Sequence, residues 1–290
     1  MAIRDARLAG ALTQQQVADA MDWSLSKMMR IESGEVTISQ NDLKPLLTYL
    51  GIKDRNVVDA LVRAAKASRQ RQQWWDKPEF SGRLTPAMKQ LISFEAEASV
   101  VRNYYPAGIP GVLQTTDYAR SVLNLYSYDL EETDIQARVA ARTRWKNDFM
   151  QRQPRTVIYS LFDESMPLRQ IGAPRVLGEQ LVDLVKAIEA GWLVARIAPF
   201  TSPNPNIGSF DIVYLGTEAE DPNNAVLYRE SFTQDEIIDD PAQIAKHRTL
   251  WDRMWSTALD ERESVTRIKS RAEELTQATI DSSGQVARGR

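Results

Sequence analysis

The chain has 290 residues, of which 43% are hydrophobic and 26% are charged, and its formal net charge is −3. This composition is typical of a globular protein with more than one buried core, so disorder is not expected. The sequence contains no cysteine and a single histidine, His247. The residues needed for thiolate metal sites, cysteine nucleophiles and most histidine-based triads are therefore missing from the sequence. We expect neither an enzyme nor a bound metal or cofactor.

No segment approaches the run of roughly 18 apolar residues that a membrane helix needs, and no secretion signal begins the sequence. We therefore expect a cytoplasmic protein. Residues 1–73 carry 11 Lys and Arg against 8 Asp and Glu, whereas the remainder has an acidic excess. A modest basic surplus fits a small nucleic-acid-binding module on an acidic body, although a domain that binds nothing can carry the same surplus.

Two short amphipathic helices with almost no connection between them are predicted in residues 12–35. Thr13 and Gln16 form a capping box at the start of the first helix. Ser24 is a good N-cap for the second helix, and Gly34 can adopt the left-handed conformation that ends it. Because about three residues join the helices, they must cross at a steep angle, as in a helix-turn-helix. Helix pairs of this kind also occur purely as packing in all-helical domains, so the spacing alone leaves DNA binding open.

The segments LTQQQVADAM and WSLSKMMRIESGE resemble the XRE family of helix-turn-helix domains, which is phage-repressor-like. The resemblance implies that the second helix lies in the DNA major groove and that Gln14 hydrogen-bonds a phosphate. The predicted DNA-contacting residues are Gln14, Gln15, Ser24, Leu25, Ser26, Lys27 and Arg30. Each has a plainer alternative: Ser24 is first of all a cap, Lys27 can be a solvated charge, and Arg30 can pair with Glu32 or Glu35. We expect Glu32 to serve the fold.

Two features depart from the family pattern. Asp22 occupies the turn position that usually carries glycine, which Asp tolerates because it visits the left-handed region more readily than most residues. Only a short helix precedes Thr13, so either the domain is short or the N-terminus is truncated.

The helical module is expected to continue to residue 73. Ser39 is predicted to cap a helix that contains Pro45, which either kinks its first turn or makes it start later. Gly51 ends this helix. A further helix is predicted over residues 54–73, with an apolar side and a basic side. The basic side can follow DNA phosphates or can simply be solvated. Its apolar residues are Val57, Leu61 and Ala65, and its basic residues are Arg63, Lys66, Arg69 and Arg71.

A larger α+β domain is predicted over residues 74–280, followed by a flexible tail at 281–290. Segment 91–123 has a mostly helical pattern, interrupted by the YYPAGIPG turn. Four later segments are rich in β-branched and aromatic residues over strand lengths, which predicts a small, largely antiparallel sheet whose last two strands form a hairpin. These segments are 155–162, 192–200, 209–215 and 225–230.

The body carries its own resemblance, in segments that include WWD, ARVAARTRW and RTVIYSLFDESMPLRQIGAP. They are similar to the domain of unknown function that follows an XRE module in actinobacterial WhiJ-like or antitoxin-like regulators. The resemblance implies a DNA-binding transcriptional regulator whose body receives a signal or a small protein encoded nearby. One recognition helix is a small footprint for tight specific binding, so we also expect a homodimer on double-stranded operator DNA.

Other hypotheses stay open at this stage. An antitoxin-like protein would sequester a small partner and use DNA binding only to repress its own operon. A small molecule could bind between the IPGVLQT turn and the sheet. The best cluster for acid–base catalysis would combine Asp163, Glu164 and Arg169 with Asp211 or Glu230, but charged strand ends are usually solvated or ion-paired.

Overall fold

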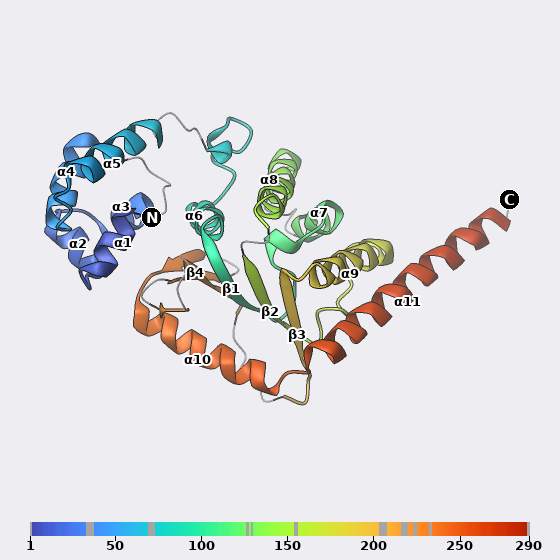
Figure 1. Ribbon diagram of the computed structural model, residues 1–290. Helices are drawn as coiled ribbons and strands as arrows, with labels where there is room; N and C mark the ends of the chain where they lie inside the picture. Colours follow the sequence, from blue (N-terminus) through green and yellow to red (C-terminus); the bar gives the residue numbers. More distant parts are fainter. Residues whose placement is uncertain are drawn as a thin grey trace.

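The computed structural model describes residues 2–32, 38–68, 73–125, 128, 130–153, 156–202, 208–215, 220–222, 225–231 and 234–288. The described part of the first 68 residues is helical (Figure 1). Its helices are α1 (Ala2–Ala9), α2 (Gln14–Ala20), α3 (Leu25–Glu32), α4 (Gln40–Tyr49) and α5 (Arg55–Ser68). Their apolar faces converge on one core, whose centre is formed by Val17, Met28, Leu43, Leu46 and Leu47.

Several predictions for this helical domain can be checked directly. Ser39 caps α4 as predicted, and Gly51 has a φ of 74° after its end. The helix begins at Gln40 and includes Pro45, so the later start is wrong. Val57 was placed on the apolar side of α5 but is 43% exposed, because the neighbouring Val58 turns towards the core instead. Gly34, Glu35, Arg69 and Arg71 lie outside the described residues.

The body is built on a mixed sheet of six strands in the order β3-β2-β1-β4-β5-β6. Neighbours among β1, β2 and β3 are parallel, whereas β4, β5 and β6 join antiparallel. The expectation of a small, largely antiparallel sheet is therefore wrong, although the β4–β5 hairpin is confirmed. The strands are β1 (Ala98–Tyr105), β2 (Val157–Asp163), β3 (Leu193–Ala198), β4 (Phe210–Leu215), β5 (Ala225–Glu230) and β6 (Asp235–Ile238).

Two strands were missed for physical reasons. β1 lies in the centre of the sheet and is buried over much of both faces, so its sequence ASVVRNYY does not alternate between apolar and polar residues. Such a run cannot be distinguished from a buried helix by periodicity alone. β6 is only four residues long and half of it is acidic, so it carries little strand signal.

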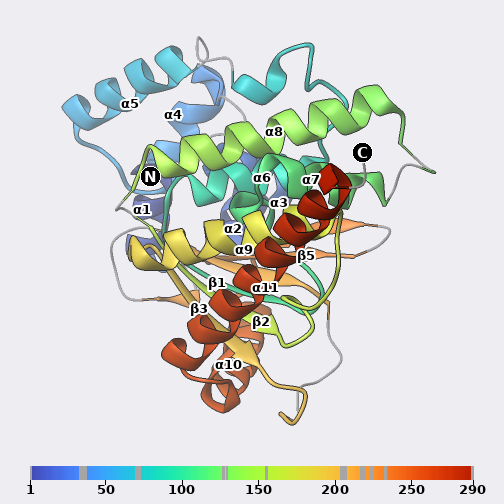
Figure 2. The same ribbon diagram turned by 90° about the vertical axis from the view of Figure 1, so that its right-hand side faces the viewer.

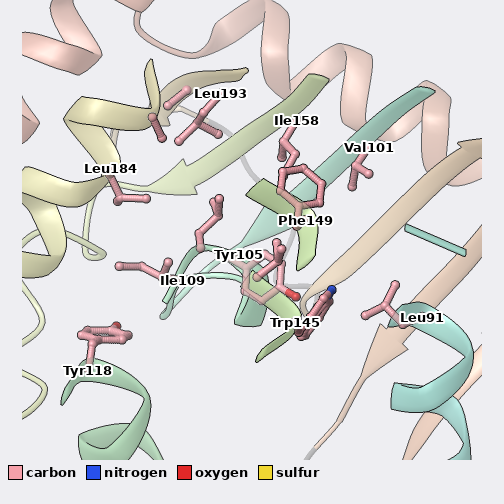
Figure 3. Close-up of a cluster of buried hydrophobic side chains, with 14 of the residues drawn as sticks. Leu91, Val101, Tyr105, Ile109, Tyr118, Trp145, Phe149, Ile158, Leu184 and Leu193 are labelled. Atoms are coloured by element: carbon pink, nitrogen blue, oxygen red, sulfur yellow. The ribbon is translucent and has the colours of Figure 1, made fainter. Parts of the chain in front are cut away.

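Helices cover the two faces of the sheet unequally (Figure 2). Parallel strands need long crossover connections, which α7 (Thr116–Asn124), α8 (Glu132–Met150) and α9 (Pro174–Glu189) provide. These helices, together with α6 (Pro86–Glu95) and the first half of α11 (Glu261–Arg288), form a core with one face of the sheet. Figure 3 shows part of that core, in which Phe149 of α8 lies near Val101 and Ile158 of the sheet and Trp145 of α8 lies beside Tyr105. The other face is covered by α10 (Pro241–Thr257).

The C-terminal region departs from the predicted tail. α11 continues to Arg288, so residues 281–288 are helical, and residues 289–290 lie outside the described part. Figure 1 shows that the last turns of α11 extend beyond the body. No helix in the described residues is long and apolar enough to cross a membrane.

Candidate nucleic-acid interface

The corner between α2 and α3 is set by local hydrogen bonds. The Thr13 hydroxyl accepts from the Gln16 backbone N–H at 3.1 Å, and the Gln16 side chain accepts from the Thr13 N–H at 2.8 Å. This is the predicted capping box. Asp22 has a φ of 56°, which confirms that the turn places it in the left-handed region. The Trp23 N–H then donates to the Ala18 carbonyl at 2.8 Å, which closes the turn.

The start of α3 is fixed in the same way. The Ser24 hydroxyl accepts from the Lys27 backbone N–H at 3.2 Å, so Ser24 is the predicted cap, and its side chain is exposed. Met28 and Ile31 face the core of the helical domain. The opposite side of α3 is left for contacts outside this core, which is the arrangement that lets a helix enter the major groove.

A buried ion pair ties α1 to the end of α3. The Arg7 guanidinium donates to both carboxylate oxygens of Glu32, at 2.9 and 3.0 Å, and also to the Leu12 carbonyl at 2.8 Å. Both side chains are almost fully buried. The expectation that Glu32 serves the fold is confirmed. Arg7, its partner, was missed in the sequence, because a pair 25 residues apart leaves no local pattern.

The predicted contact residues occupy different environments. Gln14 is buried, and its side-chain amide donates to Glu32 at 2.5 Å. Its backbone N–H still lies in the first turn of α2, where helices hold anions. Gln15 is exposed and donates to Asp19 on its own helix at 2.6 Å. The phosphate contact of Gln14 therefore stays a prediction, and the backbone is the group suited to make it.

Four predicted contacts lie on α3. Leu25 and Arg30 are half-buried, and the side chain of Ser26 lies outside the described part. Lys27 pairs with Asp42 of α4 at 3.2 Å, and its ammonium lies 4.2 Å from the centre of the Trp23 ring. Because both partners of this ion pair are more than a third exposed, DNA phosphate can compete with Asp42 for the lysine.

The acidic residues of the body do not form the catalytic cluster that the sequence could have implied. Asp211 lies on the face of the sheet that packs against α6, α7, α8, α9 and α11. The Tyr105 hydroxyl donates to it there at 2.9 Å. Asp163 lies at the end of β2 beside Tyr104, which belongs to the face covered by α10. Glu164 pairs with Arg267 and accepts from the Phe200 N–H at 2.7 Å. The carboxyls thus serve separate contacts.

One buried carboxyl pair nevertheless has unusual acidity. Burial raises the pKa of Asp211 to about 7, partly opposed by the Tyr105 hydrogen bond. Burial also raises the pKa of Glu95 well above its usual range, and the nearby Asp211 adds to the effect. The Trp145 indole donates to Glu95 at 2.9 Å. Among the described residues, no group of three His, Cys, Asp or Glu could hold a metal ion.

Comparisons with known proteins agree with this geometry. Residues 2–74 match a helix-turn-helix domain, which agrees with the α2–α3 arrangement and supports a helix-turn-helix class of protein. Residues 88–270 match the family named Domain of unknown function (DUF5753). This match spans more than half of the sequence, and the chain belongs to that family. No curated protein and no solved structure matches the chain.

Proposed function

We propose that the protein is a sequence-specific DNA-binding transcriptional regulator that reads operator DNA with α3. The observation that carries this proposal is the α2–α3 corner, in which Thr13, Asp22 and Ser24 define a tight turn between two short helices. The match of residues 2–74 to a helix-turn-helix domain supports it. In this role the exposed Ser24 and the half-buried Arg30 lie where base edges are read.

The wider biological setting is part of the same proposal and rests on the sequence resemblance. The regulator belongs to the actinobacterial WhiJ-like, antitoxin-like group, is cytoplasmic and works on the nucleoid. It binds DNA as a homodimer, since two half-sites double the footprint of one recognition helix. The body has no catalytic role and receives a signal or a small protein encoded nearby.

The test is a fluorescence-anisotropy titration with the DNA upstream of the gene and with a scrambled duplex, at two salt concentrations. We expect tighter binding to the upstream DNA, weakened by salt because bound phosphates release counterions. Arg30→Ala should weaken specific binding by about 1–3 kcal/mol, which corresponds to roughly 5- to 150-fold. Lys53→Ala is the control. Lys53 is exposed and belongs to neither α2 nor α3, and its replacement removes the same charge as Arg30→Ala.

Equal and weak binding of both duplexes would contradict the proposal. The alternative function, an interaction protein that sequesters a small partner, would then take its place. Analytical ultracentrifugation with and without the upstream duplex tests the dimer separately, and a monomer in both samples would count against it.

A further inference from the structure

One buried side chain on the flank of the proposed recognition helix does not belong to the hydrophobic cluster of its own domain. Met29 follows Leu25 by four residues and Ser26 by three, so it lies on the same side of α3 as these predicted DNA contacts. This side chain is only 6% exposed. Among the described residues, the hydrophobic core of the helical domain is built from α3 residues such as Met28 and Ile31 and does not include Met29. This hydrophobic cluster therefore does not account for the burial of Met29.

Helix α6 of the body shows the complementary feature. Ala87, Leu91 and Phe94 face the core of the body. Ser93 points the opposite way on a helix of 3.6 residues per turn, yet it is only 6% exposed. Figures 1 and 2 show α3 on the side of the helical domain that faces α6. α6 is therefore the helix of the body that is placed to cover this side of α3.

Charged residues border this contact on both sides. Arg4 of α1 is 6% exposed, and burial lowers its pKa to about 10, while Glu32 and Glu97 partly offset the effect. Glu97 belongs to the turn between α6 and β1. Asp239, between β6 and α10, has its pKa raised by burial and feels the charges of Arg7 and Glu32. Two acidic connections of the body thus lie beside α1 and the end of α3.

We propose an autoinhibitory contact, in which α6 and the acidic connections at Glu97 and Asp239 hold α1 and α3 so that the DNA-facing flank of α3 is masked. The inference rests on the proposed function, since it describes how access to the same helix is regulated. The flank at Leu25 and Met29 cannot contact α6 and the wall of a major groove at once. DNA binding then requires an open arrangement of the two parts. The apparent affinity for DNA is the intrinsic affinity multiplied by the fraction of molecules that are open.

The absence of native cysteine makes the contact testable in the full chain. Met29→Cys combined with Ser93→Cys places one thiol on each side, and a short bis-methanethiosulfonate reagent joins thiols that lie close and releases them on reduction. We expect rapid intramolecular linkage of this pair. Asp59→Cys with Ser93→Cys is the control, because Asp59 is exposed on α5, and it should link slowly.

DNA binding is then measured on the linked and the reduced protein. The linked pair should lose at least tenfold in affinity for the upstream duplex, and reduction should restore it. Equal linkage of both pairs would overturn the contact, and unchanged affinity after linkage would overturn its inhibitory role. If the unmodified chain binds no duplex, the proposed function itself fails and the masking role with it, while the linkage rates still report the contact.

A charge variant gives an independent readout without cysteine. Glu97→Gln should raise the affinity for DNA several-fold, because it removes the attraction between Glu97 and Arg4 and so weakens the masking contact. Glu131→Gln removes an equal charge at an exposed site on the body, so it corrects for general attraction between protein and phosphate. Equal effects of the two variants would count against the proposal.

Discussion

Within the described part of the helical domain, two non-glycine residues have positive φ values, and the two residue types tolerate this conformation differently. Asp22 and Ala11 have φ values of 56° and 52°. Aspartate enters this region at modest cost, whereas alanine has no polar side chain to compensate. Ala11 is exposed and ends the turn after α1, so no packing depends on its methyl group.

Replacing Ala11 should therefore stabilise the protein. Relief of the left-handed strain stabilises the folded state by about 1–2 kcal/mol. Glycine also increases the conformational entropy of the unfolded chain, which offsets part of this stabilisation. We expect Ala11→Gly to raise the free energy of unfolding of the helical domain by about 0.5–1 kcal/mol. Ala64→Gly, on the exposed side of α5, is the control of opposite sign and should cost about 1 kcal/mol. Urea denaturation followed by circular dichroism measures both.

The buried Asp211 predicts how the stability of the body depends on pH. Its pKa is about 7 in the folded protein against 3.8 in the unfolded chain. The unfolded chain therefore loses this proton first, and the folded state is progressively disfavoured as pH rises between those values. Each unit of difference corresponds to about 1.4 kcal/mol. Glu95, Glu230 and Tyr228 share the site, so Glu95 adds a slope of the same sign.

The variant Asp211→Asn removes one titrating group while keeping its shape. We expect the fall in the free energy of unfolding between pH 3.8 and about 7 to be smaller than in the parent protein. Urea denaturation at several pH values measures it. An unchanged pH profile would show that the carboxyl of Asp211 does not carry the effect.

At the scale of elements, α9 and α11 pack through a glycine. A Cβ atom at Gly178 would lie 3.2 Å from the Leu275 Cβ, closer than an ordinary contact. Gly178→Val should separate the helices and cost about 1–3 kcal/mol through overpacking. Gly108→Val is the matched control, because no atom lies within 4 Å of the equivalent Cβ position. A thermal melt that shows equal effects of the two substitutions would contradict this packing.

The whole molecule contains separate hydrophobic cores, one within residues 3–65 and others within the body. The body's cores span both faces of one sheet, whereas the helical core shares no residue with them. We therefore expect two unfolding transitions in calorimetry. Leu46→Ala should lower the free energy of unfolding of the helical domain alone, by about 2–5 kcal/mol. Leu161→Ala should lower the free energy of unfolding of the body alone, by a similar amount. A single transition shifted equally by both variants would show that the parts unfold as one unit.

The sequence determined the local features of this protein, because they depend on neighbours in the chain. Thr13, Ser24 and Ser39 cap helices, Asp22 takes the turn position, and β4 and β5 pair across their loop, all as residue type and spacing predict. Such signals act within a few residues, so no tertiary information is needed to recognise them.

Only the tertiary structure decided which distant residues meet. The Arg7–Glu32 pair, the central position of β1 and the burial of Asp211 each depend on segments that no local pattern relates. A central strand does not alternate between apolar and polar residues because both of its faces are buried. The sequence also does not indicate whether a charged side chain is solvated or paired with a carboxylate. The helix-turn-helix was therefore predictable from the sequence, whereas the masking contact proposed for α3 could be inferred only from the fold.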